Sequence, residues 1–121
     1  MTTKDLIQSY YDSLSQKDTK WKELWKEDAY FSDASQMLTA KGKEAVIQSF
    51  IPFLKGVQEV KIKQTIIEEN NACVIVSYDY MNPKGEKLHQ DVAEVWEVKD
   101  AQLARLTIYF DLTEYRTFMR G

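Results

Sequence analysis

The sequence predicts a single α+β domain, in which a curved antiparallel sheet wraps around N-terminal helices and leaves a cone-shaped internal pocket. Apolar residues recur every three or four positions up to about residue 54, which is typical of helices. From residue 57 onward they recur mostly at every second position, in runs separated by turn-forming residues. A chain of 121 residues is one domain, residues 1–121, and is long enough to bury a core.

Composition and charge exclude several function classes. A net charge of −3 argues against a sequence-independent nucleic-acid binder. No apolar stretch is long enough to span a bilayer, and the first residues carry no apolar run, so we expect no membrane partner, no signal peptide and a cytoplasmic protein. Cys73 and His89 are each the only residue of their kind, so we expect no internal disulfide and no metal site built from His or Cys.

Three helices are predicted in the first half of the chain. The first covers residues 3–16, with the apolar stripe Leu6, Ile7, Tyr10, Tyr11 and Leu14 and a cap at Thr2 or Thr3. A shorter second helix begins at the cap Asp18 and runs through Trp21, Leu24 and Trp25, with Lys26 in its last turn. The third follows Gly42, and Pro52 should end or kink it near Ile51, with Gly56 completing the stop.

Strands are expected over residues 29–33, 36–40, 57–68, 73–81, 88–98 and 103–111, followed by a helical turn that begins at Asp111. A strongly twisted sheet of the four long strands can curl around the helices and enclose a cavity. We expect its lining to include Tyr10, Phe31, Phe50, Trp96 and Phe110.

Asp33 is the first candidate for chemistry. From Ala29 the period is two, so Ala29, Phe31 and Asp33 share one face, and an inward Phe31 would carry the carboxylate inward too. A buried carboxylate is costly unless partnered, which makes the position a site candidate. The alternative is that Asp33 ends the strand and caps the turn at Ala34-Ser35, and from the sequence alone we prefer it.

Tyr10 is the second candidate, because it lies on the buried stripe of the first helix and a buried hydroxyl needs a partner. The hydroxyl either bonds a backbone carbonyl or donates to a ligand oxygen.

Three segments resemble the nuclear transport factor 2-like superfamily, in particular its SnoaL-like and ketosteroid isomerase-like members with a cystatin-like cone. They are residues 24–29 (LWKEDA), 42–46 (GKEAV) and 104–111 (ARLTIYFD), and the resemblance covers nearly the whole chain. The superfamily hosts enzymes and binding proteins on one fold, so the resemblance bears on the fold more than on the activity.

Ketosteroid isomerases use an Asp base with a Tyr and a protonated Asp as oxyanion donors. The resemblance implies that Asp33 is the base, Tyr10 the donor and Glu94 the acidic donor. A one-residue slip in the hairpin would turn Glu94 to the other face. We prefer the alternative that Glu94 is a solvated carboxylate on the outer face of the sheet.

SnoaL-like polyketide cyclases imply a different acid, Asp111, at the end of Tyr109-Phe110-Asp111. Asp111 is also well placed to cap the terminal helical turn, with Glu114 reciprocating. Since Asp111 and Phe110 lie on opposite strand faces, either the acid or the aromatic ring faces the cavity unless a bulge intervenes.

Two functions remain open. The first is a cofactor-independent isomerase or cyclase that binds a small apolar molecule, removes a proton next to a carbonyl and stabilises the enolate with Tyr10, without a metal. The second is a non-catalytic ligand-binding or protein-interaction module of the same fold. The resemblance also implies a homodimer packed through the open sheet face.

Overall fold

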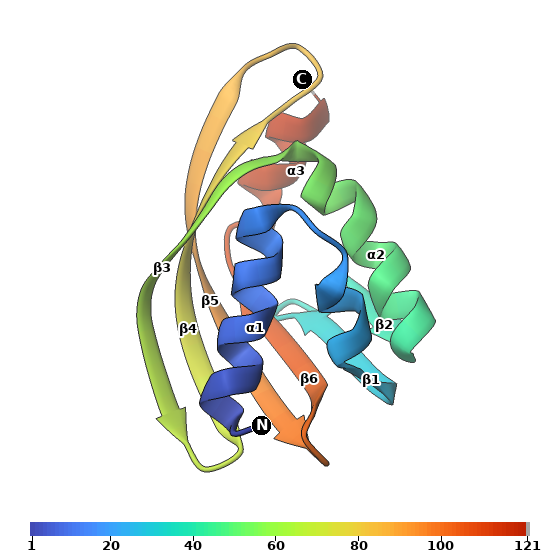
Figure 1. Cartoon of the computed structure of the whole chain (residues 1–121). Coiled ribbons are helices and arrows are strands. Elements are labelled where there is room, and N and C mark those ends of the chain that lie inside the picture. The colour runs from blue at the N-terminus through green and yellow to red at the C-terminus, as the bar shows by residue number, and fades with distance from the viewer. Residues whose placement is uncertain (121) are drawn as a thin grey trace.

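The computed structural model describes residues 1–120, with helices lying on the concave side of one six-stranded sheet (Figure 1). The elements in chain order are α1 (Thr3–Gln16), the 3-10 helix η1 (Lys20–Leu24), β1 (Trp25–Asp33), β2 (Thr39–Lys41), α2 (Lys43–Gly56), β3 (Val57–Glu68), β4 (Asn71–Met81), β5 (Lys87–Lys99), β6 (Gln102–Tyr109) and α3 (Leu112–Arg120).

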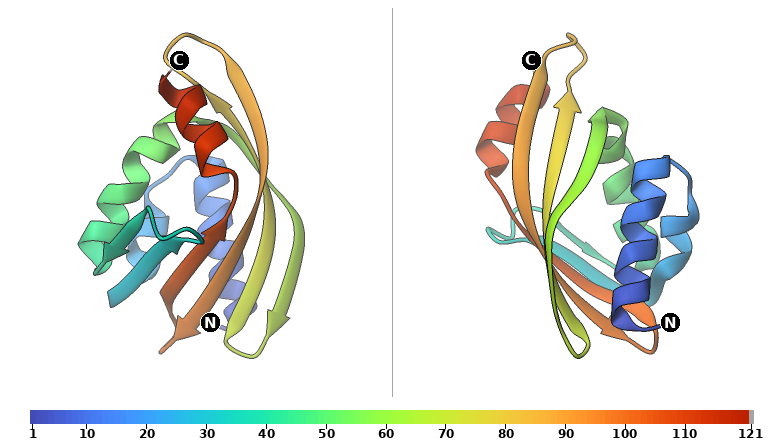
Figure 2. Two further views of the ribbon diagram at one scale, coloured as in Figure 1. Left: turned by 180° about the vertical axis from the view of Figure 1, so that it is seen from behind. Right: turned by 60° about the vertical axis from the view of Figure 1, so that its left-hand side comes forward.

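The sheet has the strand order β2-β1-β6-β5-β4-β3. Strands β3 to β6 pair consecutively and antiparallel, which confirms the predicted meander. The sheet also contains a pairing that we did not predict: β1 lies parallel to β6 along its other edge. Strand β2 then pairs antiparallel with β1 at the outer edge of the sheet. Long strands twist, and the views in Figure 2 show the sheet curving around α1 and α2 while α3 lies at one end of it.

Helix α1 begins as predicted. Thr2 and Asp5 form a reciprocal capping box, each side chain accepting from the other's backbone N–H at 3.1 Å. The helix ends at Lys17, whose φ of 58° is left-handed and lets its N–H reach the carbonyl of Leu14. Its stripe of apolar residues is buried, as expected.

The predicted second helix is too long. Only Lys20–Leu24 is helical, as one 3-10 segment, and Trp25 and Lys26 already belong to β1. The spacing of Trp21, Leu24 and Trp25 fits a single tight turn as well as a longer helix, so the period could not separate the two. Lys26 therefore does not sit at a helix end, and its ammonium contacts the carboxylates of Asp28 at 3.3 Å and Asp100 at 3.6 Å.

Helix α2 does not end near Ile51 but continues through Pro52, and it stops at Gly56 as predicted. Proline removes one helical hydrogen bond, which costs stability in isolation. The aromatic rings on either side of it anchor the helix: Phe50 packs on Phe31 with ring centroids 4.9 Å apart, and Phe53 packs on Tyr78 at 5.2 Å. Burial of these rings holds the last turn in place despite the proline.

An aromatic cluster forms the core between α1, β1 and β5. The Tyr10 ring lies 4.7 Å from that of Trp96 and 6.1 Å from that of Trp25, while the two indole rings are 5.5 Å apart. Both tryptophans are fully buried. These rings fill the core between α1 and the concave face of the sheet.

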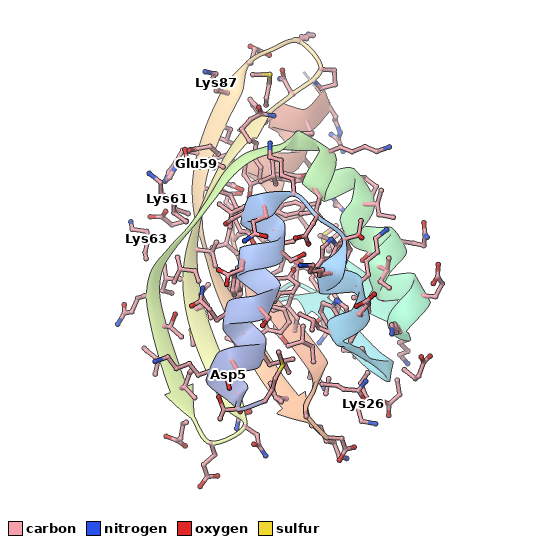
Figure 3. All side chains as sticks on the ribbon, viewed as in Figure 1. Asp5, Lys26, Glu59, Lys61, Lys63 and Lys87 are labelled. Atoms are coloured by element: carbon pink, nitrogen blue, oxygen red, sulfur yellow. The ribbon has the colours of Figure 1, made fainter. Side chains whose placement is uncertain are left out.

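The convex face of the sheet is open to solvent. Figure 3 shows Glu59, Lys61 and Lys63 of β3 pointing away from the helices. Further along the same face, Ile66, Val95 and Tyr109 are exposed large apolar side chains. The homodimer expected through this face stays a prediction. None of the described helices is both long and apolar enough to cross a bilayer.

Strand β6 ends at Tyr109, two residues earlier than predicted, and the terminal helical turn extends to the nine residues of α3. None of its residues is fully buried. It is fixed at both ends: the Gln90 amide donates to the Asp111 carbonyl at 3.0 Å and the Asn82 amide donates to the Phe118 carbonyl at 3.0 Å. Helix α3 thereby closes one end of the concave side.

Candidate functional site

A pocket of about 360 Å³ lies on the concave side of the sheet, bounded by α1, α2, β4 to β6 and the start of α3. The described residues that line it are Tyr10, Phe31, Met37, Leu38, Thr39, Ser49, Phe50, Pro52, Phe53, Tyr78, Glu94, Leu106, Ile108, Phe110 and Tyr115. Most of them are apolar or aromatic, and Glu94 is the one charged side chain in this set.

Four of the five aromatic residues expected to line the pocket do so, namely Tyr10, Phe31, Phe50 and Phe110. Trp96 does not line it, which corrects the prediction. Its ring lies beneath Tyr10 and is fully covered. Tyr10 both lines the pocket and packs on Trp96, so its ring lies between Trp96 and the cavity.

Glu94 is buried on the concave face, with only 5% of its surface exposed. The preference for a solvated carboxylate on the outer face was therefore wrong. The residues at every second position around it, Val92, Trp96 and Val98, are buried with it, whereas Val95 points outward. This alternation between inner and outer faces fixes the direction of the Glu94 side chain.

Two tyrosines hold the Glu94 carboxylate. The Tyr11 hydroxyl donates to Oε1, and the Tyr78 hydroxyl donates to Oε2 at 2.9 Å. The Trp96 indole N–H donates in turn to the Tyr11 hydroxyl oxygen at 3.0 Å. The result is a chain of hydrogen bonds that begins in the core at Trp96 and ends at a carboxylate in the wall of the pocket.

The apolar surroundings of Glu94 decide its protonation. Burial disfavours the ionised form and raises the pKa of Glu94 to about 7, although the hydrogen bonds from Tyr11 and Tyr78 favour the carboxylate and oppose this. Burial, followed by the nearby charge of Glu94, raises the pKa values of Tyr10, Tyr11 and Tyr78 well above 10. The tyrosines are thus proton donors in hydrogen bonds at neutral pH, and Glu94 is poised between its two forms.

Asp33 is also buried, with 3% of its surface exposed, but its carboxylate is not part of the pocket wall. Oδ1 accepts from the Leu38 N–H at 2.8 Å, and Oδ2 accepts from the Ser35 N–H at 3.2 Å and from the Ser35 hydroxyl. Burial pulls the pKa of Asp33 upward, but these hydrogen bonds outweigh it and hold the pKa below its ordinary value. The geometry is that of a turn cap, and the structure does not bring Asp33 to Tyr10.

Asp111 is exposed and caps α3, where its Oδ1 accepts from the Glu114 N–H at 2.9 Å. The reciprocal bond expected from Glu114 is absent from the interactions of residues 1–120; the Glu114 carboxylate accepts from the Gln90 amide at 2.9 Å instead. Of the two alternatives at this strand end, the aromatic ring of Phe110 faces the cavity and the acid does not.

Sequence reasoning missed Tyr11 and Tyr78 as functional candidates. Tyr11 was placed on the apolar stripe of α1 and treated only as core. Tyr78 alternates with Val74, Val76 and Tyr80 on the buried face of β4. The signal that could have found Tyr78 is that β4 and β5 each place a polar group within an apolar alternation, and no such signal marks Tyr11 in α1.

A larger and more open groove of about 660 Å³ lies between the C-terminal ends of α1 and α2 and the start of β3. Its two acids are already engaged: Glu59 pairs with Lys61 at 3.2 Å, and Asp18 accepts from the Ser13 hydroxyl and from the Lys20 N–H at 3.0 Å. It holds no buried acid–base pair, so the smaller pocket is the better candidate for chemistry.

The described part of the chain contains no group of three or more His, Cys, Asp or Glu side chains placed to hold a metal ion. What the pocket does offer is an apolar cavity, one carboxyl group with a pKa near neutrality and tyrosine hydroxyls around it. Such a wall can bind a mostly apolar molecule and exchange a proton with it.

Comparison with solved structures gives close likeness in fold at low sequence identity. TerC, co-crystallised with polyporic acid, has 14% identity and a TM-score of 0.84, with 98% of each chain covered. A putative SnoaL-like polyketide cyclase from Jannaschia sp. CCS1 has 15% identity and a TM-score of 0.84, covering 98% of this chain and 92% of the other. An NTF2-like protein of unknown function from Burkholderia pseudomallei has 13% identity and a TM-score of 0.85, with 98% of each chain covered.

At such identities the likeness concerns the fold alone. No curated protein matches the chain by sequence. The sequence pattern of the SnoaL-like domain, by contrast, matches residues 7–106, which include most of α1 and the residues Tyr10, Tyr78 and Glu94. The resemblance noted from three short segments is thereby confirmed over most of the chain, and the protein belongs to the SnoaL-like domain family.

Proposed function

We propose that this protein binds a small, largely apolar carbonyl compound in the pocket and moves a proton at the carbon next to the carbonyl, without a cofactor. The reaction class is that of an isomerase or cyclase. The observation that carries the proposal is the environment of Glu94: a carboxyl group in an apolar cavity, held by two tyrosine hydroxyls.

Glu94 takes the role of general acid and base. An acid–base group works best when its pKa is near the working pH, and burial raises the pKa of Glu94 to about 7. A carboxylate in this position accepts the proton from the carbon, and the carboxylic acid returns it elsewhere on the product. Asp33 and Asp111 receive no role in proton transfer, because each caps a turn or helix outside the pocket wall.

Tyr78 and Tyr10 supply the hydrogen bonds that an enolate oxygen needs. Both line the pocket. The Tyr10 hydroxyl makes no hydrogen bond to another described residue, so its proton is available to a ligand. Tyr78 donates to Glu94 and can turn toward a bound oxygen.

Support from relatives is at the level of the family. Two similar structures bear the name of putative SnoaL-like polyketide cyclases, and TerC was co-crystallised with polyporic acid. These likenesses favour a small-molecule pocket, and the choice of proton transfer rests on Glu94.

The test uses 2-tetralone, an apolar bicyclic ketone with acidic protons next to its carbonyl. The protein should accelerate deuterium uptake at those carbons in D₂O, followed by proton NMR. Glu94→Gln keeps the size of the side chain and should lower the exchange rate about 100-fold or more, because a general base contributes that much. Asp33→Asn is the matched control and should retain the parent rate.

Equal exchange rates for the parent and Glu94→Gln would refute the proposed role of Glu94. Binding of 2-tetralone, detected by chemical shift changes in the pocket, with no exchange in any variant would instead support the non-catalytic binding module.

A further inference from the structure

Trp96 does not line the pocket, but its hydrogen-bond partner Tyr11 contacts Glu94, the candidate acid. Trp96 is fully buried in the core, and its indole N–H donates a hydrogen bond to the hydroxyl oxygen of Tyr11 at 3.0 Å. Tyr11 donates to Oε1 of Glu94. Trp96 lies two positions after Glu94 in β5, so both side chains extend from the same face of one strand.

The direction of these bonds follows from the donors available. An indole N–H can only donate, and a tyrosine hydroxyl has a single proton and two acceptor lone pairs. Since Trp96 donates to the Tyr11 oxygen, that oxygen serves as the acceptor, and its one proton points to Glu94. If the Tyr11 proton turned toward Trp96, it would face the indole proton, and the bonds to Trp96 and to Glu94 would both be lost.

Tyr78 is free of such a constraint. Its hydroxyl donates to Oε2 of Glu94 at 2.9 Å, lines the pocket, and receives no hydrogen bond from another described residue. The two oxygens of Glu94 therefore differ: Oε1 faces a hydroxyl fixed from behind, and Oε2 faces one that can turn toward the cavity.

We infer that Trp96 is a positioning residue that fixes the Tyr11 hydroxyl as a permanent donor to Oε1 of Glu94, so that Oε2 is the oxygen that gains and loses the proton. When Oε2 is protonated it donates to Tyr78, whose own proton then turns toward a ligand in the pocket. Trp96 and Tyr11 keep the carboxyl group aimed in both states. This inference rests on the proposed acid–base role of Glu94.

Trp25 provides a control within the same cluster. Its ring lies 5.5 Å from that of Trp96, it is equally buried, and it packs against Tyr10 as Trp96 does. Its indole N–H, however, has no hydrogen-bond partner in the described structure. Replacing Trp25 changes packing without changing the hydrogen bonds to Tyr11.

The experiment compares Trp96→Phe with Trp25→Phe in protein labelled with ¹³C at the glutamate carboxyl carbon, with Glu94→Gln identifying the Glu94 signal. In Trp96→Phe the Tyr11 hydroxyl is free to accept from neutral Glu94, so the pKa of Glu94 should rise by about half to one pH unit. Trp25→Phe should leave that pKa as in the parent. Equal pKa values for Glu94 in the parent and Trp96→Phe, or equal rises in both variants, would overturn the inference.

A second measurement uses the unsubstituted protein and remains decisive if Trp96→Phe fails to fold. With ¹⁵N-labelled tryptophan, the Trp96 indole proton should keep its hydrogen-bonded, downfield position on both sides of the Glu94 titration, because Tyr11 does not turn. Loss of the downfield position when Glu94 becomes protonated would contradict a fixed Tyr11. Neither measurement needs a ligand, so they fail or succeed separately from the 2-tetralone exchange that tests the proposed function.

Discussion

Asp33 and Glu94 are two buried carboxyl groups on the inner face of one sheet, with 3% and 5% of their surfaces exposed. Their pKa values are nevertheless shifted in opposite directions from the ordinary values of Asp and Glu. Hydrogen bonds from the turn that follows β1 hold the pKa of Asp33 below its ordinary value. Burial among aromatic rings raises the pKa of Glu94 to about 7. Burial of the side chain alone therefore does not identify an acid–base residue.

The difference lies in what covers each group. Asp33 is covered by its own turn, whose residues 34–37 are exposed, and backbone N–H groups of that turn point at the carboxylate. Glu94 is covered by side chains of the core, and its donors are the hydroxyls of two tyrosine side chains. A rigid backbone donor stabilises the ionised form permanently, whereas an apolar wall penalises it.

The largest expected effect comes from opening the core beside Glu94. Trp25→Ala removes a fully buried ring that packs on Tyr10, Phe50 and Trp96, and should cost roughly 3–5 kcal/mol of unfolding free energy. Water entering the cavity should also lower the pKa of Glu94 and leave that of Asp33 unchanged. Denaturant unfolding measures the loss, and an unchanged midpoint would contradict the packing described for Trp25.

The second prediction concerns pH. A pKa of about 7 in the folded state against 4.5 in the unfolded chain means that folded Glu94 holds its proton to higher pH. Its contribution to stability is complete below about pH 4.5 and is lost as the pH rises to about 7, a change of roughly 3 kcal/mol. Glu94→Gln should therefore gain stability relative to the parent between pH 5 and pH 8.

The measurement is the difference in unfolding free energy between Glu94→Gln and the parent protein at each pH. His89 also titrates in this range, because the hydrogen bond that it donates to Asp79 and the charges of Asp79 and Asp91 raise its pKa, with Lys63 nearby on Asp91. Its contribution is shared by both proteins and cancels. A difference in stability between parent and Glu94→Gln that does not vary with pH would refute the raised pKa.

A smaller effect is expected at Asp33. Asp33→Ala removes the acceptor of the Ser35 and Leu38 N–H groups and should cost about 1–2 kcal/mol at pH 7, while Asn retains one acceptor and should cost less. The cost of Ala should shrink as the pH falls below about 3.8, because a lowered pKa stabilises the fold only while the group is ionised. A larger loss in Asn than in Ala would argue against a turn cap.

The smallest effect on either carboxyl group is expected from the convex face. Val95 neighbours Glu94 in β5 but is exposed on the opposite side, near Ile66 and Tyr109. If the homodimer forms through this face, Val95→Lys should turn a dimeric mass into a monomeric one in light scattering at tens of micromolar. The pKa of Glu94 should stay the same. A monomeric parent protein would refute the homodimer.

Much of the fold could be predicted from the sequence because local patterns set it. Thr2 and Asp5 define the start of α1, and the turn residues between the long runs define the meander. The parallel pairing of β1 with β6 could not be predicted, since it joins residues some 75 positions apart that share no local signal. Pro52 misled the prediction because its rule is local, while the packing of Phe50 and Phe53 is not.

The site was harder for a related reason. The positions of Tyr10 and Phe31 on apolar stripes predict that both are buried. For Glu94, which the resemblance implies as the acidic donor, we prefer from the sequence a solvated carboxylate, although Val92, Trp96 and Val98 share its face. A carboxylate among such residues was treated as exposed because charge usually implies exposure. The partners Tyr11 and Tyr78 come from two other elements, and only the folded chain brings their hydroxyls to one carboxyl group.

The most direct test of the account is a ¹³C NMR titration of the side-chain carboxyl carbons of Asp33 and Glu94 in the same ligand-free protein. We predict that Glu94 titrates near pH 7 and that Asp33 titrates below 3.8. Glu94 titrating at or below 4.5 would contradict the account, because the pocket would then hold an ordinary ionised carboxylate rather than an acid–base group.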